Sequence, residues 1–162
     1  MKRLVVYYSL SGNTGEAAQK IAGALGADLL KLETVKPMPK SFAAQILTGG
    51  GQVLFGYVPA LKPFDKEPGG YDEIILGSPI WNGKAVPAVS AFLRDGAAAE
   101  KVTALFFLSG GGGTEKGLAA LAKKLPNLRT TVSLLDRKNE GSGDNDAKIE
   151  KFVGEIGYGE GC

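Results

Sequence analysis

The chain contains no histidine, and its single cysteine, Cys162, is the last residue. Without histidine there is no imidazole to act as a general base, to complete a Ser-His-Asp triad or to ligate a metal ion. One thiol forms neither an internal disulfide nor a thiolate metal site. We therefore expect no metal centre and no catalytic side chains, so any chemistry must come mostly from a bound cofactor.

Long apolar runs and strong net charge are also missing. The apolar runs are far shorter than the ~20 residues that a membrane-spanning helix needs. The N-terminal stretch 1–8 is too short for a signal-peptide core and has no small-residue cleavage site. The net charge is only +2, and the Lys and Arg residues are scattered. We therefore expect a cytoplasmic protein with no membrane partner and no nucleic-acid partner.

The 162 residues, of which 44% are hydrophobic and 22% charged, suit one globular domain covering 1–162. Apolar stretches predict strands at 4–8, 27–33, 71–78, 101–109 and 128–135. Amphipathic stretches predict helices at 14–25, 87–94, 114–125 and 145–156. Buried strands that alternate with helices indicate a doubly wound α/β fold, with a five-stranded parallel sheet in the order 2-1-3-4-5. Ligands of such sheets bind beyond the carboxyl ends of the strands, which draws attention to three loops.

The first loop leads from the first strand directly into a helix. It contains Ser9, Ser11, Gly12, Asn13 and Thr14. The start of a helix presents unpaired N–H groups and a partial positive charge, which together favour an anion such as phosphate. The hydroxyl and amide side chains can add hydrogen bonds.

Two other features bear on this phosphate hypothesis. No Lys or Arg lies between Arg3 and Lys20, so dipoles rather than counter-charges would hold the anion. Ser11 or Asn13 could instead simply cap the helix, as such residues commonly do. Neither the P-loop pattern nor the dinucleotide-binding pattern occurs at this turn.

The second loop is expected at 77–84 and carries Trp81, the only tryptophan. Turn residues flank it, including the Asn82-Gly83 pair. The ring is either a platform for a flat ligand or part of the core, and position alone leaves both open.

The third loop has four consecutive glycines, Gly110 to Gly113, between Ser109 and Thr114. Ordering four glycines costs much backbone conformational entropy. Such a loop is expected where the backbone itself must approach a ligand closely. The alternative is a floppy turn. We expect Thr114 to cap the helix that follows.

A phosphate cradle, an aromatic wall and a rim of backbone N–H groups match flavin mononucleotide (FMN) best. The three loops also resemble those of the flavodoxin family. The stretch 9–14 is similar to the phosphate loop of that family, 77–81 to the flavin loop with a stacking Trp, and 109–114 lies where the second flavin loop belongs. The resemblance covers nearly the whole chain and implies a flavodoxin-like fold.

By that resemblance, FMN would contact residues of all three loops. In flavodoxins a peptide after the Trp can flip when the flavin is reduced, and the matching peptides here join residues that tolerate positive φ. The expected cofactor-binding residues are Ser9, Ser11, Gly12, Asn13, Thr14, Pro79, Ile80, Trp81, Asn82, Gly83, Ser109, Gly110, Gly111, Gly112 and Gly113.

Two departures from the family pattern matter. The third loop lacks the tyrosine that often covers the other flavin face, so that face is open or is covered by Tyr57 or Phe55 from the long connection 34–70. Flavodoxins are typically acidic, whereas this chain is near neutral, with Lys84 and Lys116 close in sequence to the flavin loops. Nearby positive charge stabilises an anionic reduced flavin, which argues against a very low second reduction potential.

We therefore expect an FMN-binding redox protein that transfers electrons between protein partners. The alternative is an NAD(P)H-dependent FMN reductase acting on quinones or nitro compounds, since hydride transfer between stacked rings needs no catalytic side chain. A binding module that has lost the flavin is disfavoured because all three loops are retained.

Overall fold

A computed structural model describes residues 1–39, 41, 44, 47–48, 51, 56–111, 113–138 and 140–158. Its strands are β1 (Arg3–Tyr7), β2 (Asp28–Lys31), β3 (Glu73–Trp81), β4 (Lys84–Ala85), β5 (Val102–Ser109) and β6 (Thr130–Leu135). Its α-helices are α1 (Asn13–Leu25), α3 (Pro87–Phe92), α4 (Gly96–Lys101), α5 (Glu115–Ala122) and α6 (Asn145–Tyr158). Two short 3₁₀ helices, η1 (Pro68–Gly70) and η2 (Glu140–Asp144), precede β3 and α6.

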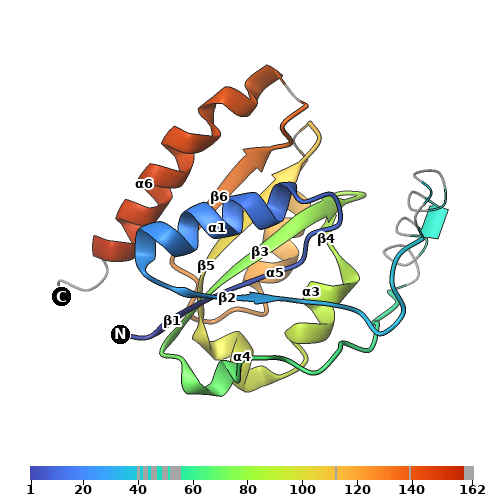
Figure 1. The fold of residues 1–162 in the computed structure, drawn as a ribbon, viewed down its shortest axis with the longest axis horizontal. Coiled ribbons are helices and arrows are strands. Elements are labelled where there is room, and N and C mark those ends of the chain that lie inside the picture. The colour runs from blue at the N-terminus through green and yellow to red at the C-terminus, as the bar shows by residue number, and fades with distance from the viewer. Residues whose placement is uncertain are drawn as a thin grey trace.

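The strands form one sheet in the order β2-β1-β3-β5-β6 (Figure 1). All neighbours along this path are parallel, and only the short β4 pairs antiparallel, with the end of β3. Counting the parallel strands along the chain gives the predicted order 2-1-3-4-5. The predicted doubly wound α/β fold is confirmed.

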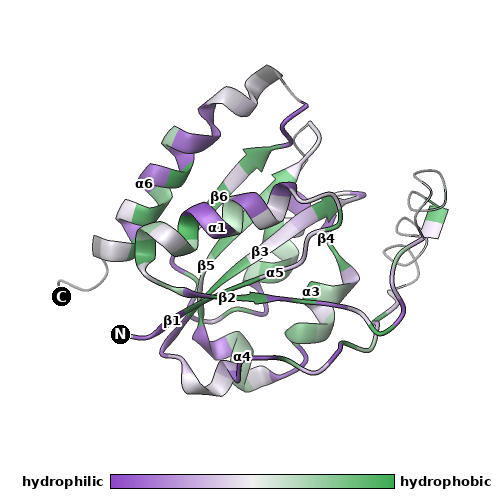
Figure 2. Ribbon diagram, in the orientation of Figure 1, coloured by the Kyte–Doolittle hydropathy of each residue, from purple (hydrophilic) through white to green (hydrophobic). Residues whose placement is uncertain are grey.

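Helices cover both faces of the sheet, and each face has its own core. Alternate residues of β1 divide between them, because successive side chains of a strand point to opposite faces. Leu4 and Val6 pack with residues of α3, α4 and α5, whereas Val5 and Tyr7 pack with residues of α1 and α6. In Figure 2 the central strands are largely hydrophobic, while α1 and α6 carry hydrophilic patches. A sheet buried on both faces is what the continuous apolar stretches predicted.

The predicted end of the third strand is wrong. We expected the third strand to end at Ser78, but β3 continues to Trp81. The Asn82-Gly83 pair turns the chain back, so that Ile80 pairs with Ala85 and Trp81 with Lys84. Pro79, Ile80 and Trp81 therefore lie on a strand end rather than in an open loop, because Asn-Gly favours a tight hairpin.

The helix α4 was also missed. The prediction placed no helix between 94 and 101, where Asp95 accepts a hydrogen bond from the Ala97 N–H (3.0 Å) and caps the start of α4. Three consecutive alanines give this segment helix propensity but too few large apolar residues for a periodic pattern.

A buried carboxylate fixes the amino end of the sheet, away from the predicted ligand loops. Glu73 is 2% exposed and accepts hydrogen bonds from Arg3 Nε (2.7 Å), Arg129 Nη2 (2.5 Å) and Thr103 Oγ1 (2.5 Å). Burial by itself raises the pKa of Glu73, but the hydrogen bonds from Thr103 and Arg3 and the charges of Arg3 and Arg129 outweigh it and lower the pKa overall. The ionised Glu73 thus ties β1, β3, β5 and the start of β6 together.

Candidate functional site

The turn from β1 into α1 has the geometry of an anion site. Gly12 is the N-cap of α1 with φ of 96°, a conformation that strains residues with a side chain. Its N–H donates to Ser9 Oγ (3.1 Å), which holds the turn closed. No side chain caps α1, so the alternative that Ser11 or Asn13 merely caps this helix is wrong. The N–H groups of residues 13–15 therefore have neither an intrahelical acceptor nor a side-chain cap, whereas the Glu16 N–H donates to the Gly12 carbonyl (2.9 Å).

The start of α1 packs closely against the end of β1. A Cβ on Gly15 would lie 3.3 Å from the Tyr7 ring, so α1 starts almost in contact with the end of β1. Thr14 is 3% exposed, whereas Ser11 is exposed to solvent. Burial raises the pKa of both Tyr7 and Tyr8, so both rings stay neutral beside the turn.

The first and third loops are joined through Asp136. Asn13 Nδ2 donates to Asp136 Oδ1 (2.8 Å), and the Asp136 N–H donates to the Ser109 carbonyl (2.9 Å). A Cβ on Gly110 would lie 4.0 Å from Asp136 Oδ2. The sequence prediction missed Asp136, although its place directly after the last predicted strand is where such sheets put ligand-facing residues. An amide nitrogen has two hydrogens, so Asn13 keeps one donor for a further acceptor.

The β3–β4 hairpin carries the predicted second loop. Asn82 and Gly83 have φ of 49° and 70°, the two consecutive left-handed residues of a tight hairpin turn. Ser78, which is 1% exposed, accepts from the Val86 N–H (3.2 Å) and donates to the Pro79 carbonyl (2.8 Å). These bonds fix the hairpin to the strand that it extends.

Trp81 packs partly on the core, which is one of the two alternatives that the sequence left open. Its ring is partly buried against the core of the face covered by α3, α4 and α5. Its plane stands at 87° to that of Tyr8, with ring centroids 6.0 Å apart, an edge-to-face pair. The residue as a whole is half-buried and stands at the end of β3. A stacking role for Trp81 stays a prediction.

The third loop lies beside the hairpin. A Cβ on Gly83 would be 3.7 Å from the Gly113 carbonyl oxygen, so the two backbones pass close to each other. Gly110 and Gly111 are exposed, and Gly113 has φ of 73°. Gly112 lies outside the described residues.

Thr114 does not cap α5 as expected. It occupies the N-cap position, but its Oγ1 shares a hydrogen bond with Ser133 Oγ (2.8 Å) instead of bonding the helix backbone. This bond fastens the end of the third loop to β6.

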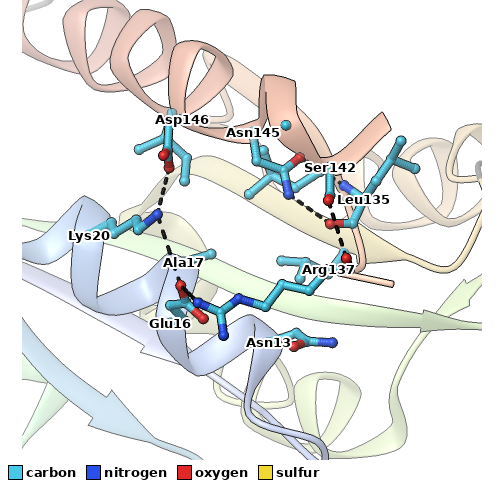
Figure 3. A pocket seen from close by; sticks show the side chains of 13 residues that line it. Asn13, Glu16, Ala17, Lys20, Leu135, Arg137, Ser142, Asn145 and Asp146 are labelled. Carbon is cyan, nitrogen blue, oxygen red and sulfur yellow. Dashed lines mark hydrogen bonds and ion pairs between the residues drawn. The ribbon is translucent and has the colours of Figure 1, made fainter. Parts of the chain in front are cut away.

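A polar pocket of about 260 Å³ adjoins the first loop (Figure 3). Arg137 reaches from the end of β6 to pair with Glu16 in the first turn of α1. Lys20 lies between Glu16 (3.9 Å) and Asp146 (2.6 Å) and so links α1 to α6. The sequence showed no cation near this turn, because Arg137 approaches only through the tertiary fold. Two cations therefore compensate the one carboxylate in the first turn.

Residues from the long connection lie on the other side of the hairpin. Tyr57 is 44% exposed and lines a second pocket with Lys84. Phe55, the other aromatic expected to cover a flavin face, lies outside the described residues. That either ring covers a flavin stays a prediction.

The structure thus brings the three predicted loops to one edge of the sheet. A hydrogen-bonded path joins the first loop to the third, and a backbone contact joins the third to the second. No helix in the described part of the chain has the length and apolar character needed to cross a bilayer.

Solved structures share this fold. A proposed flavoprotein from Bacteroides eggerthii is 25% identical, with 94% of this chain and 98% of that chain covered and a TM-score of 0.72. A flavoprotein from Lactobacillus acidophilus in complex with FMN is 22% identical, covering 93% and 97% of the two chains with a TM-score of 0.70. A WrbA-like flavodoxin from Agrobacterium tumefaciens is 16% identical, covering 94% and 95% with a TM-score of 0.55. The fold is flavodoxin-like.

The comparisons by sequence add no further relative. No protein-family model matches the chain, and neither does any curated protein. At these identities, the flavodoxin-like neighbours establish the architecture, and the ligand of this chain has to be argued from its own residues.

Proposed function

We propose that this protein binds FMN at the carboxyl edge of its flavodoxin-like sheet and transfers electrons. The observation that carries the proposal is the meeting of three loops at this edge, joined by the path Asn13–Asp136–Ser109 and by the contact between Gly83 and Gly113. The edge lies beside β1 and β3, where the strand order of the sheet reverses and where doubly wound folds bind their ligands.

The first loop fits the phosphate of FMN. Its donors are the first-turn N–H groups of α1 and the hydroxyls of Ser9, Ser11 and Thr14. Ser9 accepts the Gly12 N–H and can still donate its own hydrogen. The nearby carboxylate of Glu16 is paired with Arg137 and Lys20, which reduces its repulsion of a phosphate.

The hairpin and the third loop fit the flavin ring. Trp81 is half-buried at the end of β3, and the turn at Asn82-Gly83 presents peptide groups next to it. Exposed glycine backbone at Gly110 and Gly111 allows close approach of a ring edge. FMN would supply the electron-transfer chemistry, while these residues bind the cofactor, orient it and exclude water. A structural neighbour that contains FMN supports the assignment.

A second function is favoured by the charges beside the hairpin. Residues 34–64 and 74–94 contain no Asp or Glu, so the surroundings of Lys84 lack the acidity typical of flavodoxins. Such surroundings suit an NAD(P)H-dependent FMN reductase, which takes anionic nucleotides and passes their electrons to quinones or nitro compounds. The electron carrier remains our first proposal because the described loops contain no acid–base pair.

FMN titration of the purified protein, followed by flavin fluorescence, tests the cofactor. Ser11→Asp places a negative charge on the exposed loop and should weaken FMN binding about tenfold or more, because the charge repels the phosphate. Gln19→Asp adds the same charge at an exposed position of α1 and should leave affinity within about twofold. Thr14→Leu should abolish binding. Equal affinity of Ser11→Asp and Gln19→Asp, or no FMN binding by the natural chain, would refute the assignment.

Stepwise reduction of the FMN complex separates the two functions. An electron carrier should ignore NADPH and take up electrons from dithionite in two resolved one-electron steps. A reductase should be bleached rapidly by NADPH and reoxidised by a quinone. Absorbance spectra recorded during the titration distinguish these results.

A further inference from the structure

The second pocket lies behind the β3–β4 hairpin, between the hairpin, α3, α5 and the returning part of the long connection. Its volume is about 280 Å³. In Figure 1, β4 and α3 adjoin each other and α5 lies across the sheet face behind β3. None of the residues expected in the three FMN loops lines this pocket, although Tyr57, one of the two aromatics that could cover a flavin face, does.

One face of α5 forms the floor. Gly117, Ala120 and Leu121 recur at the three- and four-residue spacing that places side chains on one face of a helix, and Lys124 follows in the turn after α5. Gly117 lets the hairpin approach: a Cβ there would lie 3.1 Å from the Gly83 carbonyl oxygen and from Ile80 Cδ1. The close contact at Gly117 and the small side chain of Ala120 leave a hollow beyond them.

The walls are mostly apolar and include one aromatic ring. Ala85 and Pro87 line the side formed by the hairpin and α3, and Val58 lines the opposite side. Tyr57, which is 44% exposed, also lines the pocket. Apolar walls with one aromatic ring and few polar groups are typical of small-molecule sites.

All the charge that lines the pocket is positive. Lys84 and Lys124 both contribute to the lining, and no acidic residue does. Within the described part of the chain, neither lysine forms an ion pair. The segments 34–64 and 74–94, which supply the walls, contain no Asp or Glu at all. An apolar hollow with two uncompensated cations favours a ligand that pairs an apolar ring with an anionic group.

We infer that this pocket binds a small organic anion consisting of an aromatic ring with a carboxylate, sulfonate or phosphate group. The ring lies on the apolar face of α5 beside Tyr57, and the anionic group faces Lys84 and Lys124. The volume suits one ring system of one or two fused rings rather than a dinucleotide, because sites for larger ligands run to ~1,000 Å³. This inference does not rest on FMN binding.

The probe is 2-naphthoate, with 2-naphthalenemethanol as its neutral analogue. Both are titrated into the full-length chain in the presence of excess FMN, so that the loops of the proposed flavin site do not compete for the ring. Binding is followed by amide NMR shifts, including that of Gly117. We expect naphthoate to shift these amides and to bind about fivefold or more tightly than the neutral analogue.

Two pairs of adjacent residues on α5 and the turn after it provide matched variants. Lys124→Glu reverses a charge in the pocket and should weaken naphthoate about fivefold or more, whereas Lys123→Glu makes the same change outside it and should act less than twofold. Ala120→Phe fills the hollow and should abolish binding, whereas Ala119→Phe should not. All four positions are exposed, so the variants should fold normally.

The naphthoate titrations of the natural chain and the four variants decide whether the pocket binds an aromatic anion. Loss of naphthoate binding in Lys124→Glu and Ala120→Phe, with both controls unaffected, supports the site whether or not FMN binds. Equal effects within either pair, equal binding of the neutral analogue, or the absence of naphthoate binding would overturn it. Failure of the FMN titration, by contrast, would leave these results unchanged.

Discussion

Gly77 provides the sharpest test of the packing at the centre of the sheet. It lies in β3 opposite Tyr7 of β1 and Phe106 of β5. A Cβ at this position would be 2.0 Å from Phe106 Cζ and 2.5 and 2.6 Å from the two Cε atoms. Contacts between carbon atoms are favourable only at about 3.5–4.0 Å. Gly77→Ala therefore requires the edge of the ring to move by roughly 1.5 Å or more, although Phe106 is fully buried.

Two known costs set the range for the loss of unfolding free energy in Gly77→Ala. Overpacking a well-packed core typically costs about 1–3 kcal/mol, and this overlap lies at the severe end. The protein can always relieve the clash by displacing the ring, so the cost should not exceed the ~3–5 kcal/mol lost when a buried Phe is removed altogether. We expect Gly77→Ala to lower the free energy of unfolding by about 3 kcal/mol, a large part of the ~5–15 kcal/mol of a typical domain.

Equilibrium urea unfolding, followed by circular dichroism, measures this change. Gly23→Ala is the control: Gly23 is exposed in α1 with no atom within 4 Å of an added Cβ, so the same substitution should stabilise by about 0.5–1 kcal/mol. The deciding measurement is a double-mutant cycle with Phe106→Ala. Removing the ring should take away most of the cost of Gly77→Ala. Additive effects would refute the clash as the cause.

Two further predictions concern the amino end of the sheet and the hairpin turn. Glu73→Gln should destabilise by about 3 kcal/mol at neutral pH, because it leaves Arg3 and Arg129 without their anion. The folded state lowers the pKa of Glu73, so its stabilisation is present above the ordinary pKa of 4.5 and is lost as the pH falls through the pKa of the folded state. The free energy of unfolding, measured with urea between pH 7 and pH 2, should therefore depend less on acid in the variant than in the natural chain. An unchanged pH profile would contradict the assignment. Asn82→Ala should cost about 1 kcal/mol because φ is 49°, whereas Asn82→Gly should be nearly neutral; equal melting temperatures of the two variants would show that the turn is not left-handed.

Much of the architecture could be predicted from local pattern. The apolar stretches and the amphipathic helices between them indicated a doubly wound sheet, since only a parallel sheet covered on both faces buries such strands. The positions of the three loops followed from that topology. Strand boundaries were harder to predict: the Asn82-Gly83 pair was expected as a turn within the loop 77–84, and the structure shows that this turn closes a hairpin that extends β3 through Trp81.

The candidate site was predictable residue by residue only where its residues lie in the loops themselves. Asp136 and Arg137 follow the last strand and approach the first loop across the sheet edge, more than a hundred residues away in sequence. No sequence spacing relates them to Asn13 or Glu16. The same holds for Thr114, whose hydroxyl bonds Ser133 rather than the helix that it precedes.

The sequence by itself therefore determined the order of elements, the apolar faces and the three loops, because periodicity and turn chemistry act over a few residues. Only the tertiary structure decided which charges meet. It placed Arg137 against Glu16, buried Glu73 between two arginines, and left Lys84 and Lys124 beside an apolar hollow without an ion-pair partner among the described residues. The physical reason is that ion pairs and pockets depend on distances between segments remote in sequence, and those distances exist only once the helices pack on the sheet.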